Sequence, residues 1–197
     1  VKSDKGAISV QTIKAPAEVV TSMAEAVGKI LDFYTETFGP PPVPALNIVE
    51  VQGANWRSQW SVGTLLLPSS QFKKDFDLPA LASAVAHQWF PLKIAVKDPG
   101  NDAWLVDGMA EFASLLYFEK TLSPAEAQEH TDKALVKALG YEGTISVRQA
   151  GGLEKDSPEY RSLVQYKGAF VLRMLRWVIG EESFQKLLTQ YLQQFQN

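Results

Sequence analysis

The chain has 197 residues, 46% hydrophobic and 11% aromatic, which is enough apolar material to bury a sizeable core in one domain. Its formal net charge is −3 and no run of lysine and arginine exceeds two residues, which argues against a nucleic acid or an anionic membrane surface as partner. The absence of cysteine excludes disulfides, thiolate metal sites and thiol nucleophiles, and no apolar run approaches the roughly 18 residues of a membrane span.

The first part of the chain predicts one helix followed by short strands. Residues 1–14 alternate loosely and are typical of an extended segment. Apolar residues recur at helical spacing over 16–38, and the Gly-Pro-Pro-Pro run that starts at Gly39 ends this helix because proline lacks the amide donor. The segments 45–51 (ALNIVEV) and 61–68 (SVGTLLLP) then predict short strands or a hairpin.

The rest of the chain predicts helices. Their spans share helical spacing of apolar residues and recognisable start or stop signals, and they cover about 77–90, 105–120, 123–140, 157–179 and 181–195. Ser123 and Glu126 form a capping box at the start of one of them. A polar, glycine-rich loop is expected over 141–156.

This order of elements predicts an α+β fold, in which sheet and helices segregate along the chain. We expect a single domain over 1–197, with a helix and a small sheet in about 1–76 and a mostly helical part in about 77–197. The sequence begins at Val1, without methionine or signal peptide, so we also expect it to be a piece of a longer precursor.

The stretch SAVAHQWF (83–90) has the rhythm of a zinc-peptidase helix, with one histidine where that chemistry needs two. In a His-Glu-x-x-His helix the two histidines share one face and hold zinc, and the glutamate activates the metal-bound water. If His87 is the second histidine, the first ligand position is Ser83 and the base position is Ala84. A serine hydroxyl is a poor neutral zinc ligand and a methyl group cannot move a proton, so the motif is broken for catalysis.

AHQWF, followed by WLVDGMAEF at 104–112, resembles the aminopeptidase N family of zinc metallopeptidases, the gluzincins with a thermolysin-like catalytic domain. The zinc helix of that family usually reads His-Glu-x-x-His-Gln-Trp-Phe-Gly. Its next helix carries Trp-Leu-Asn-Glu-Gly-Phe-Ala, whose glutamate is the third ligand. The resemblance covers about residues 15–195, implies the thermolysin-like α+β fold, and places Asp107, a shorter carboxylate, at the third ligand position.

Two further elements of that family are present with substitutions. In the stretch QYKGAFVLRML the resemblance puts the family's oxyanion-stabilising tyrosine at Gln165. The neighbour Tyr166 is about 100° further round a helix and is expected to point elsewhere. The family's Gly-Ala-Met-Glu-Asn strand, which binds the substrate backbone and free amine, corresponds to 52–63 (QGANWRSQWSVG), where Ser58 or Trp56 replaces the amine-binding acid.

Each of these polar residues also has a structural explanation. His87 is either a surviving ligand or a hydrogen-bonded histidine on a semi-apolar helix. Asp107 is either a ligand or a carboxylate that the dipole favours at a helix start. Glu111, one turn later, is a weak ligand candidate or a hydrogen-bonded partner, and nothing in the sequence places His130 close to these groups.

Several other residues are assigned to packing. Aromatic and methionine side chains at helical spacing are expected in the core, namely Trp89, Trp104, Met109 and Phe112. Trp56 and Trp60 either line a groove at a sheet edge or simply pack. Lys167 and Gly168 are expected to allow two helices to approach closely.

The leading functional hypothesis is a degenerate aminopeptidase-like domain, catalytically inactive, with a binding or scaffolding role. By the resemblance, the positions of first ligand, general base, oxyanion tyrosine and amine-binding acid are all substituted, so this hypothesis assigns no catalytic residue, no metal ligand and no cofactor. The expected partner is a peptide or a neighbouring domain of the same precursor, with no nucleic acid and no membrane span in this segment. The compartment is left open, periplasmic or extracellular if the precursor carries a signal peptide.

Two alternatives stay open. One is a zinc-dependent aminopeptidase with a rewired ligand set, drawn from His87, Asp107 and either Glu111 or His130. The other is a purely structural domain, which requires buried Trp56 and Trp60 and no open groove.

Overall fold

The computed structural model describes residues 2–3, 6–53, 58–90, 92, 96–141, 145–155 and 157–195. The strands are β1 (Lys2–Ser3), β2 (Gly6–Gln11), β3 (Ala45–Val51), β4 (Gln59–Ser61) and β5 (Thr64–Pro68). The α-helices are α1 (Ala17–Phe38), α2 (Leu78–Ala86), α3 (Pro99–Asp102), α4 (Asp107–Thr121), α5 (Pro124–Ala138), α6 (Pro158–Tyr160), α7 (Lys167–Ile179) and α8 (Glu181–Gln194). A π-helical stretch, Arg161–Tyr166, joins α6 to α7.

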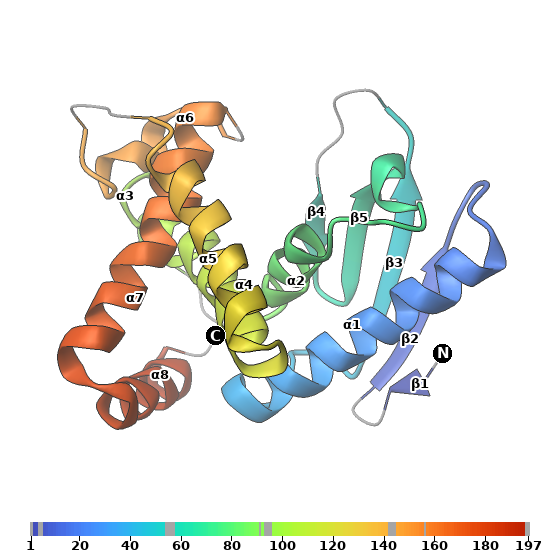
Figure 1. Ribbon diagram of the computed structural model, residues 1–197, viewed down its shortest axis with the longest axis horizontal. Helices are drawn as coiled ribbons and strands as arrows, with labels where there is room; N and C mark the ends of the chain where they lie inside the picture. The colour runs from blue at the N-terminus through green and yellow to red at the C-terminus, as the bar shows by residue number, and fades with distance from the viewer. Residues whose placement is uncertain are drawn as a thin grey trace.

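The sheet and α1 lie on one side of the molecule and α5 to α8 on the other, with α2 and α4 between them (Figure 1). This layout confirms the predicted α+β class, with the sheet in the first part of the chain and helices in the rest. No helix among the described residues is long and apolar enough to cross a membrane.

The sheet has the strand order β1-β2-β3-β5-β4. Its three central strands are parallel, and β1 and β4 pair antiparallel at the edges. The hairpin considered for 45–51 with 61–68 is therefore wrong, because β3 and β5 are parallel neighbours. The hairpin is instead β4 with β5, and it turns at Gly63, whose φ of 65° lies in the left-handed region that glycine adopts without strain.

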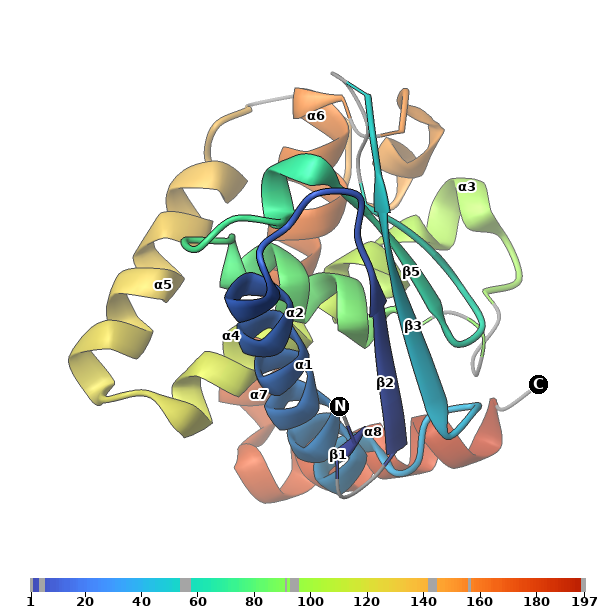
Figure 2. The same ribbon diagram turned by 90° about the vertical axis from the view of Figure 1, so that its right-hand side faces the viewer.

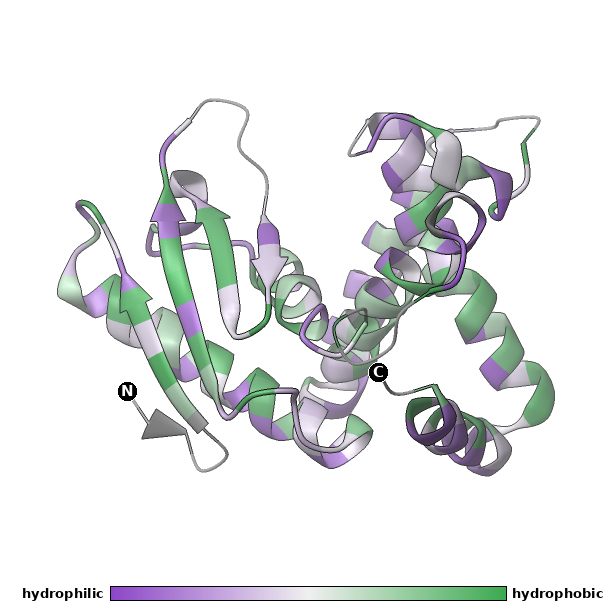
Figure 3. Ribbon diagram, turned by 180° about the vertical axis from the view of Figure 1, so that it is seen from behind, coloured by the Kyte–Doolittle hydropathy of each residue, from purple (hydrophilic) through white to green (hydrophobic). Residues whose placement is uncertain are grey.

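Helix α1 packs along one face of the sheet (Figure 2). The alternation of β3 puts Leu46 and Ile48 into the core at 4% and 0% exposure, while Asn47 between them is exposed. Hydrophobic residues accordingly dominate β5 and alternate with polar ones on β3 (Figure 3). The helix predicted from this spacing is confirmed as α1. Its buried apolar stripe includes Val19, Met23, Val27, Ile30, Leu31, Tyr34 and Phe38.

Helix α4 is the centre of the helical part. It is buried from Asp107 to Phe118 and lies between α2 and α7. At the crossing with α7, a Cβ atom added to Gly108 would lie 3.0 Å from the backbone of Gly168. The expectation that Gly168 permits close helix packing is confirmed, and this approach brings the start of α4 next to the residues that precede α7.

Most of the predicted core and helix ends are also confirmed. Trp89, Met109 and Phe112 are buried, whereas Trp104 is only partly buried. The capping box of Ser123 is present at the start of α5. The helix expected over 77–90 ends its regular α-helical part at Ala86, and its last four residues continue as turns.

Candidate functional site

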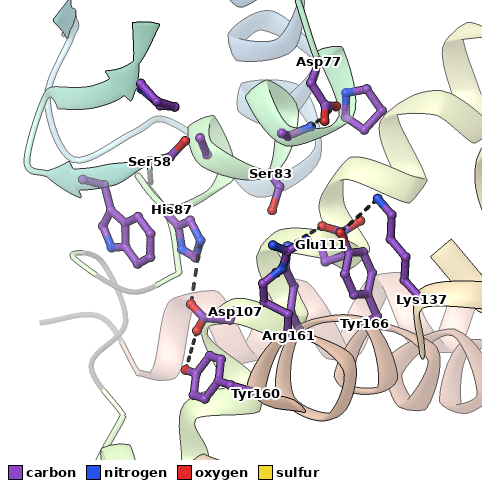
Figure 4. Close-up of a pocket in the computed structure, with 16 residues that line it drawn as sticks. Ser58, Asp77, Ser83, His87, Asp107, Glu111, Lys137, Tyr160, Arg161 and Tyr166 are labelled. Carbon is purple, nitrogen blue, oxygen red and sulfur yellow. Dashed lines mark hydrogen bonds and ion pairs between the residues drawn. The ribbon is translucent and has the colours of Figure 1, made fainter. Parts of the chain in front are cut away.

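A cavity of about 280 Å³ opens between the sheet and the helical part. Its lining residues include members of β4, β5, α2, α4, α5, α6 and the π-helical stretch, and the labelled side chains gather around it in Figure 4. The positions that the sequence singled out on the zinc-type helix and its partner helix all line it, namely Ser83, Ala84, His87, Asp107 and Glu111. An open cavity counts against the purely structural alternative, which required that no groove remain.

His87 follows directly after α2 and is 5% exposed. Its ring stacks on the indole of Trp60 from β4, with ring centroids 3.6 Å apart and planes inclined by 3°. Its Nδ1 lies 3.4 Å from the carbonyl oxygen of Phe90, which can only accept, so this contact is a hydrogen bond when Nδ1 carries the proton. The other ring nitrogen, Nε2, then presents its lone pair to the cavity.

Burial lowers the pKa of His87 to about 4. The carboxylate of Asp107 and the hydrogen bond to Phe90 act in the opposite direction, and the charge of Lys155 adds to the lowering. The imidazole is therefore neutral near pH 7.

Asp107 stands at the first residue of α4 and faces His87. Its Oδ1 lies 3.8 Å from Nε2 of His87 and, although buried, accepts no hydrogen bond from the described residues. Its Oδ2 accepts a 2.5 Å hydrogen bond from the hydroxyl of Tyr160 on α6. Tyr160 thus holds the carboxylate in place with one oxygen directed at the histidine.

Glu111, one turn further along α4, is 6% exposed and has different partners. The side-chain amide of Gln165 donates to its Oε2 at 2.9 Å. Burial raises the pKa of Glu111, while the hydrogen bond from Gln165, the positive charge of Lys137 and the hydroxyl of Ser83 lower it. Ser83 and Gln165, to which the resemblance assigns family functions, therefore both act on one buried carboxylate.

Tyr166 does not point away from the site. It lines the cavity beside Gln165, and the expectation that it would face elsewhere is wrong. The two neighbours belong to the π-helical stretch, whose wider turns change which residues share a face. Lys137 of α5 donates to the Tyr166 hydroxyl at 3.2 Å and lies 5.0 Å from the centre of its ring.

A catalytic zinc site usually has three protein ligands. In this cavity Nε2 of His87 and Oδ1 of Asp107 lie 3.8 Å apart, and Oδ1 accepts no hydrogen bond from the described residues. The positions that the resemblance assigns to the first ligand and the base carry the neutral hydroxyl of Ser83 and the methyl group of Ala84. Among the described residues no group of three histidine, cysteine, aspartate or glutamate side chains is placed to hold a metal.

Of the remaining residues considered from the sequence, some line the cavity and others do not. Ser58 and Trp60 line the cavity. Trp60 is partly buried, with the ammonium of Lys155 4.8 Å from its ring centre, and Trp56 lies outside the described residues. His130 stacks on Phe118 at a centroid distance of 4.3 Å and is not among the residues that line the cavity.

The sequence did not point to Lys137, Tyr160 or Arg161, which also line the cavity. Tyr160 is 53 residues from Asp107 along the chain, so no local pattern connects them. The one usable signal was the Ser-Pro-Glu-Tyr start of the helix at Ser157, because a capped first turn fixes where Tyr160 lies.

The sequence profile described as the Peptidase family M1 domain matches residues 63–197. Human endoplasmic reticulum aminopeptidase 2 is 29% identical over 182 residues, which are 85% of this chain and 19% of that protein. Probable aminopeptidase 1 of Sulfurisphaera tokodaii is 28% identical over 187 residues, 87% of this chain and 24% of its own length. The chain therefore spans about a fifth to a quarter of these relatives.

Solved structures agree on the fold. The M1 zinc metallopeptidase from Deinococcus radiodurans superposes with a TM-score of 0.71 at 20% identity, over 94% of this chain and 40% of that one. A two-domain M1 zinc metallopeptidase bound to L-tryptophan has a TM-score of 0.74 at 19% identity, over 100% of this chain and 43% of that one.

Proposed function

Because this chain belongs to peptidase family M1, we propose that it is a non-catalytic member whose cleft binds a ligand without hydrolysing it. One observation carries the proposal. The first-ligand and base positions of the family motif, Ser83 and Ala84, line the same cavity as His87 and Asp107, so the substitutions lie where the chemistry would take place.

Peptide hydrolysis in this family type depends on a base that takes a proton from the attacking water. The methyl group of Ala84 has no atom that could accept it. Glu111 is the other carboxylate on α4 that lines the cavity, but it is engaged by Gln165. A carboxylate whose hydrogen bonds are directed at protein groups is poorly placed to serve a water at the His87 side of the cleft.

The residue at the oxyanion-stabilising position also supports a non-catalytic role. Gln165 replaces the tyrosine implied there, and its amide is used by Glu111. The hydroxyl of Tyr166 accepts from Lys137. These bonds favour a cleft that keeps a fixed polar lining, which suits binding of a peptide or of a neighbouring protein segment.

A zinc-dependent aminopeptidase with a rewired ligand set is the second candidate. The observation in its favour is the 3.8 Å approach of Nε2 of His87 to Oδ1 of Asp107, since both atoms are of the kinds that bind zinc. It needs a third donor that the described residues do not offer.

Zinc content measured after incubation with excess zinc and desalting, together with hydrolysis of aminoacyl anilides, separates the two. We expect far less than one equivalent of zinc and no zinc-dependent turnover. One equivalent of zinc that is lost in His87→Ala, with turnover that depends on it, would overturn the proposal. The triple variant Ser83→His, Ala84→Glu and Asp107→Glu is the positive control and is expected to bind zinc.

A further inference from the structure

Two hydrogen-bond acceptors face each other in the cleft, and no donor from the described residues satisfies the carboxylate oxygen. Oδ1 of Asp107 and Nε2 of His87 are 3.8 Å apart, and their residues are 8% and 5% exposed. We propose that this pair binds a primary ammonium group of a ligand, which donates one hydrogen bond to each atom. The inference rests on the proposed non-catalytic role, because a zinc ion held by the same atoms would compete with the ammonium group.

The surrounding contacts hold both acceptors in position. The hydroxyl of Tyr160 donates a 2.5 Å hydrogen bond to Oδ2 of Asp107, which leaves Oδ1 as the oxygen available to a ligand. The carbonyl of Phe90 lies 3.4 Å from Nδ1 of His87 and directs the lone pair of Nε2 toward Asp107. The indole of Trp60 stacks on the same ring and restricts its rotation. A site with both acceptors fixed in advance loses little conformational entropy when it binds.

The unsatisfied carboxylate oxygen of Asp107 indicates which kind of ligand group fits this site. A buried carboxylate oxygen without a donor destabilises the protein, so a group that supplies hydrogen and positive charge is favoured there. An ammonium group has three donors and no acceptor, and it needs only two fixed partners, whereas a catalytic zinc needs three protein ligands.

The other two carboxylates that line the cavity each accept a hydrogen bond from the protein. Glu111 accepts from Gln165, and Asp77 accepts from the amide of Ala80 as the cap of α2. Oδ1 of Asp107 differs from them in being a buried carboxylate oxygen with no hydrogen-bond partner among the described residues. The cavity volume of about 280 Å³ leaves room for more than the ammonium group alone.

The chain has two histidines, His87 and His130, which makes the site directly observable by NMR of the imidazole signals. His130 stacks on Phe118 outside the cavity and serves as the internal control. The titration uses the metal-free protein in the presence of a chelator, near neutral pH. The probes are alanine amide, N-acetylalanine amide and N-acetyl-lysine amide.

We expect alanine amide or N-acetyl-lysine amide to shift the His87 signals in a saturable way and to leave His130 unchanged. N-acetylalanine amide has no ammonium group and should shift neither. A response to alanine amide identifies an α-ammonium ligand, and a response to the lysine derivative alone identifies a side-chain ammonium. No saturable shift with either amine, or equal shifts of both histidines, would overturn the inference.

A pair of variants with the same change in charge tests the contact. Asp107→Asn should weaken binding of the responding amine by at least about tenfold, since hydrogen bonds to charged groups contribute strongly. Glu129→Gln, in an exposed ion pair with Lys133, should leave the affinity unchanged. Unchanged affinity in folded Asp107→Asn contradicts the proposal, and if that variant does not fold, the titration of the wild-type protein decides alone.

Zinc content is measured on the same preparation, so that stoichiometric zinc identifies a failure of the non-catalytic role and not of the ammonium site.

Discussion

The side-chain amide of Gln165 donates a 2.9 Å hydrogen bond to the carboxylate of Glu111 across the interface between the π-helical stretch and α4. Gln165 occupies the position at which the family resemblance implies the oxyanion-stabilising tyrosine. On that correspondence, the side chain at this position satisfies a buried carboxylate of the protein itself, where the tyrosine would face a substrate. The hydroxyl of Ser83 also favours the charged form of this carboxylate.

Gln165→Leu should lower the free energy of unfolding by about 1–3 kcal/mol, because it leaves the buried carboxylate of Glu111 without its amide donor. Urea unfolding followed by circular dichroism measures the change. Gln128→Leu on the exposed side of α5 is the matched control and should stay within about 0.5 kcal/mol of wild type. Equal effects of the two substitutions would show that the bond to Glu111 contributes nothing specific.

Glu111→Gln should change how stability depends on pH. Burial raises the pKa of this carboxyl above its ordinary value of 4.5 in the folded protein. Between that ordinary value and the raised one, the folded state binds more protons than the unfolded chain, so the free energy of unfolding contributed by Glu111 falls as pH rises through this window. The variant cannot titrate and should lose that fall, becoming more stable relative to wild type at the upper end of the window.

The measurement is a series of urea unfolding curves from acidic to neutral pH. Glu25→Gln on the exposed side of α1 makes the same change in charge and should keep the pH dependence of wild type. If Glu111→Gln follows wild type across the whole series, the carboxyl is not destabilised by its burial.

The features predicted correctly from the sequence are those set by neighbours along the chain. The apolar stripe of α1 and the capping box of Ser123 depend on residues within a few turns, and both are present. The parallel pairing of β3 with β5 was not predicted, because the spacing of apolar residues does not carry the direction of a partner strand. The bond between Gln165 and Glu111 joins residues 54 apart, which no local pattern relates.

The predicted orientation of Tyr166 was wrong for a related reason. The expectation assumed an ordinary α-helix, in which adjacent residues are about 100° apart. The stretch before α7 is π-helical, so Gln165 and Tyr166 both reach the cavity. A π-helical stretch in an otherwise helical sequence leaves no clear composition signal.

Gly168→Ala should lower the free energy of unfolding by about 1–3 kcal/mol through overpacking at the crossing of α7 and α4. An added Cβ would lie 3.2 Å from Cα of Gly108 and 3.3 Å from Cβ of Trp104, and neither can move without shifting a helix. Gly152→Ala is the matched control, because nothing lies within 4 Å of a Cβ there. Thermal unfolding of both variants tests the close approach, and a Gly168→Ala protein as stable as Gly152→Ala would contradict it.

Acid should destabilise the protein through His87. Its pKa is about 4 in the folded protein against an ordinary value of 6.5, mainly because burial disfavours the imidazolium. Between these two values the unfolded chain binds more protons, so the free energy of unfolding falls as pH drops from 6.5 toward 4, by up to about 3 kcal/mol from this residue. His87→Gln should lose this component, and His130→Gln, on the less buried histidine, should retain it. Urea unfolding of the three proteins at each pH provides the comparison. The charges of Asp107 and Lys155 act on the pKa of His87 in opposite directions, so neither replaces burial as the main cause. If the loss of stability at low pH persists in His87→Gln, that loss belongs to other titrating groups.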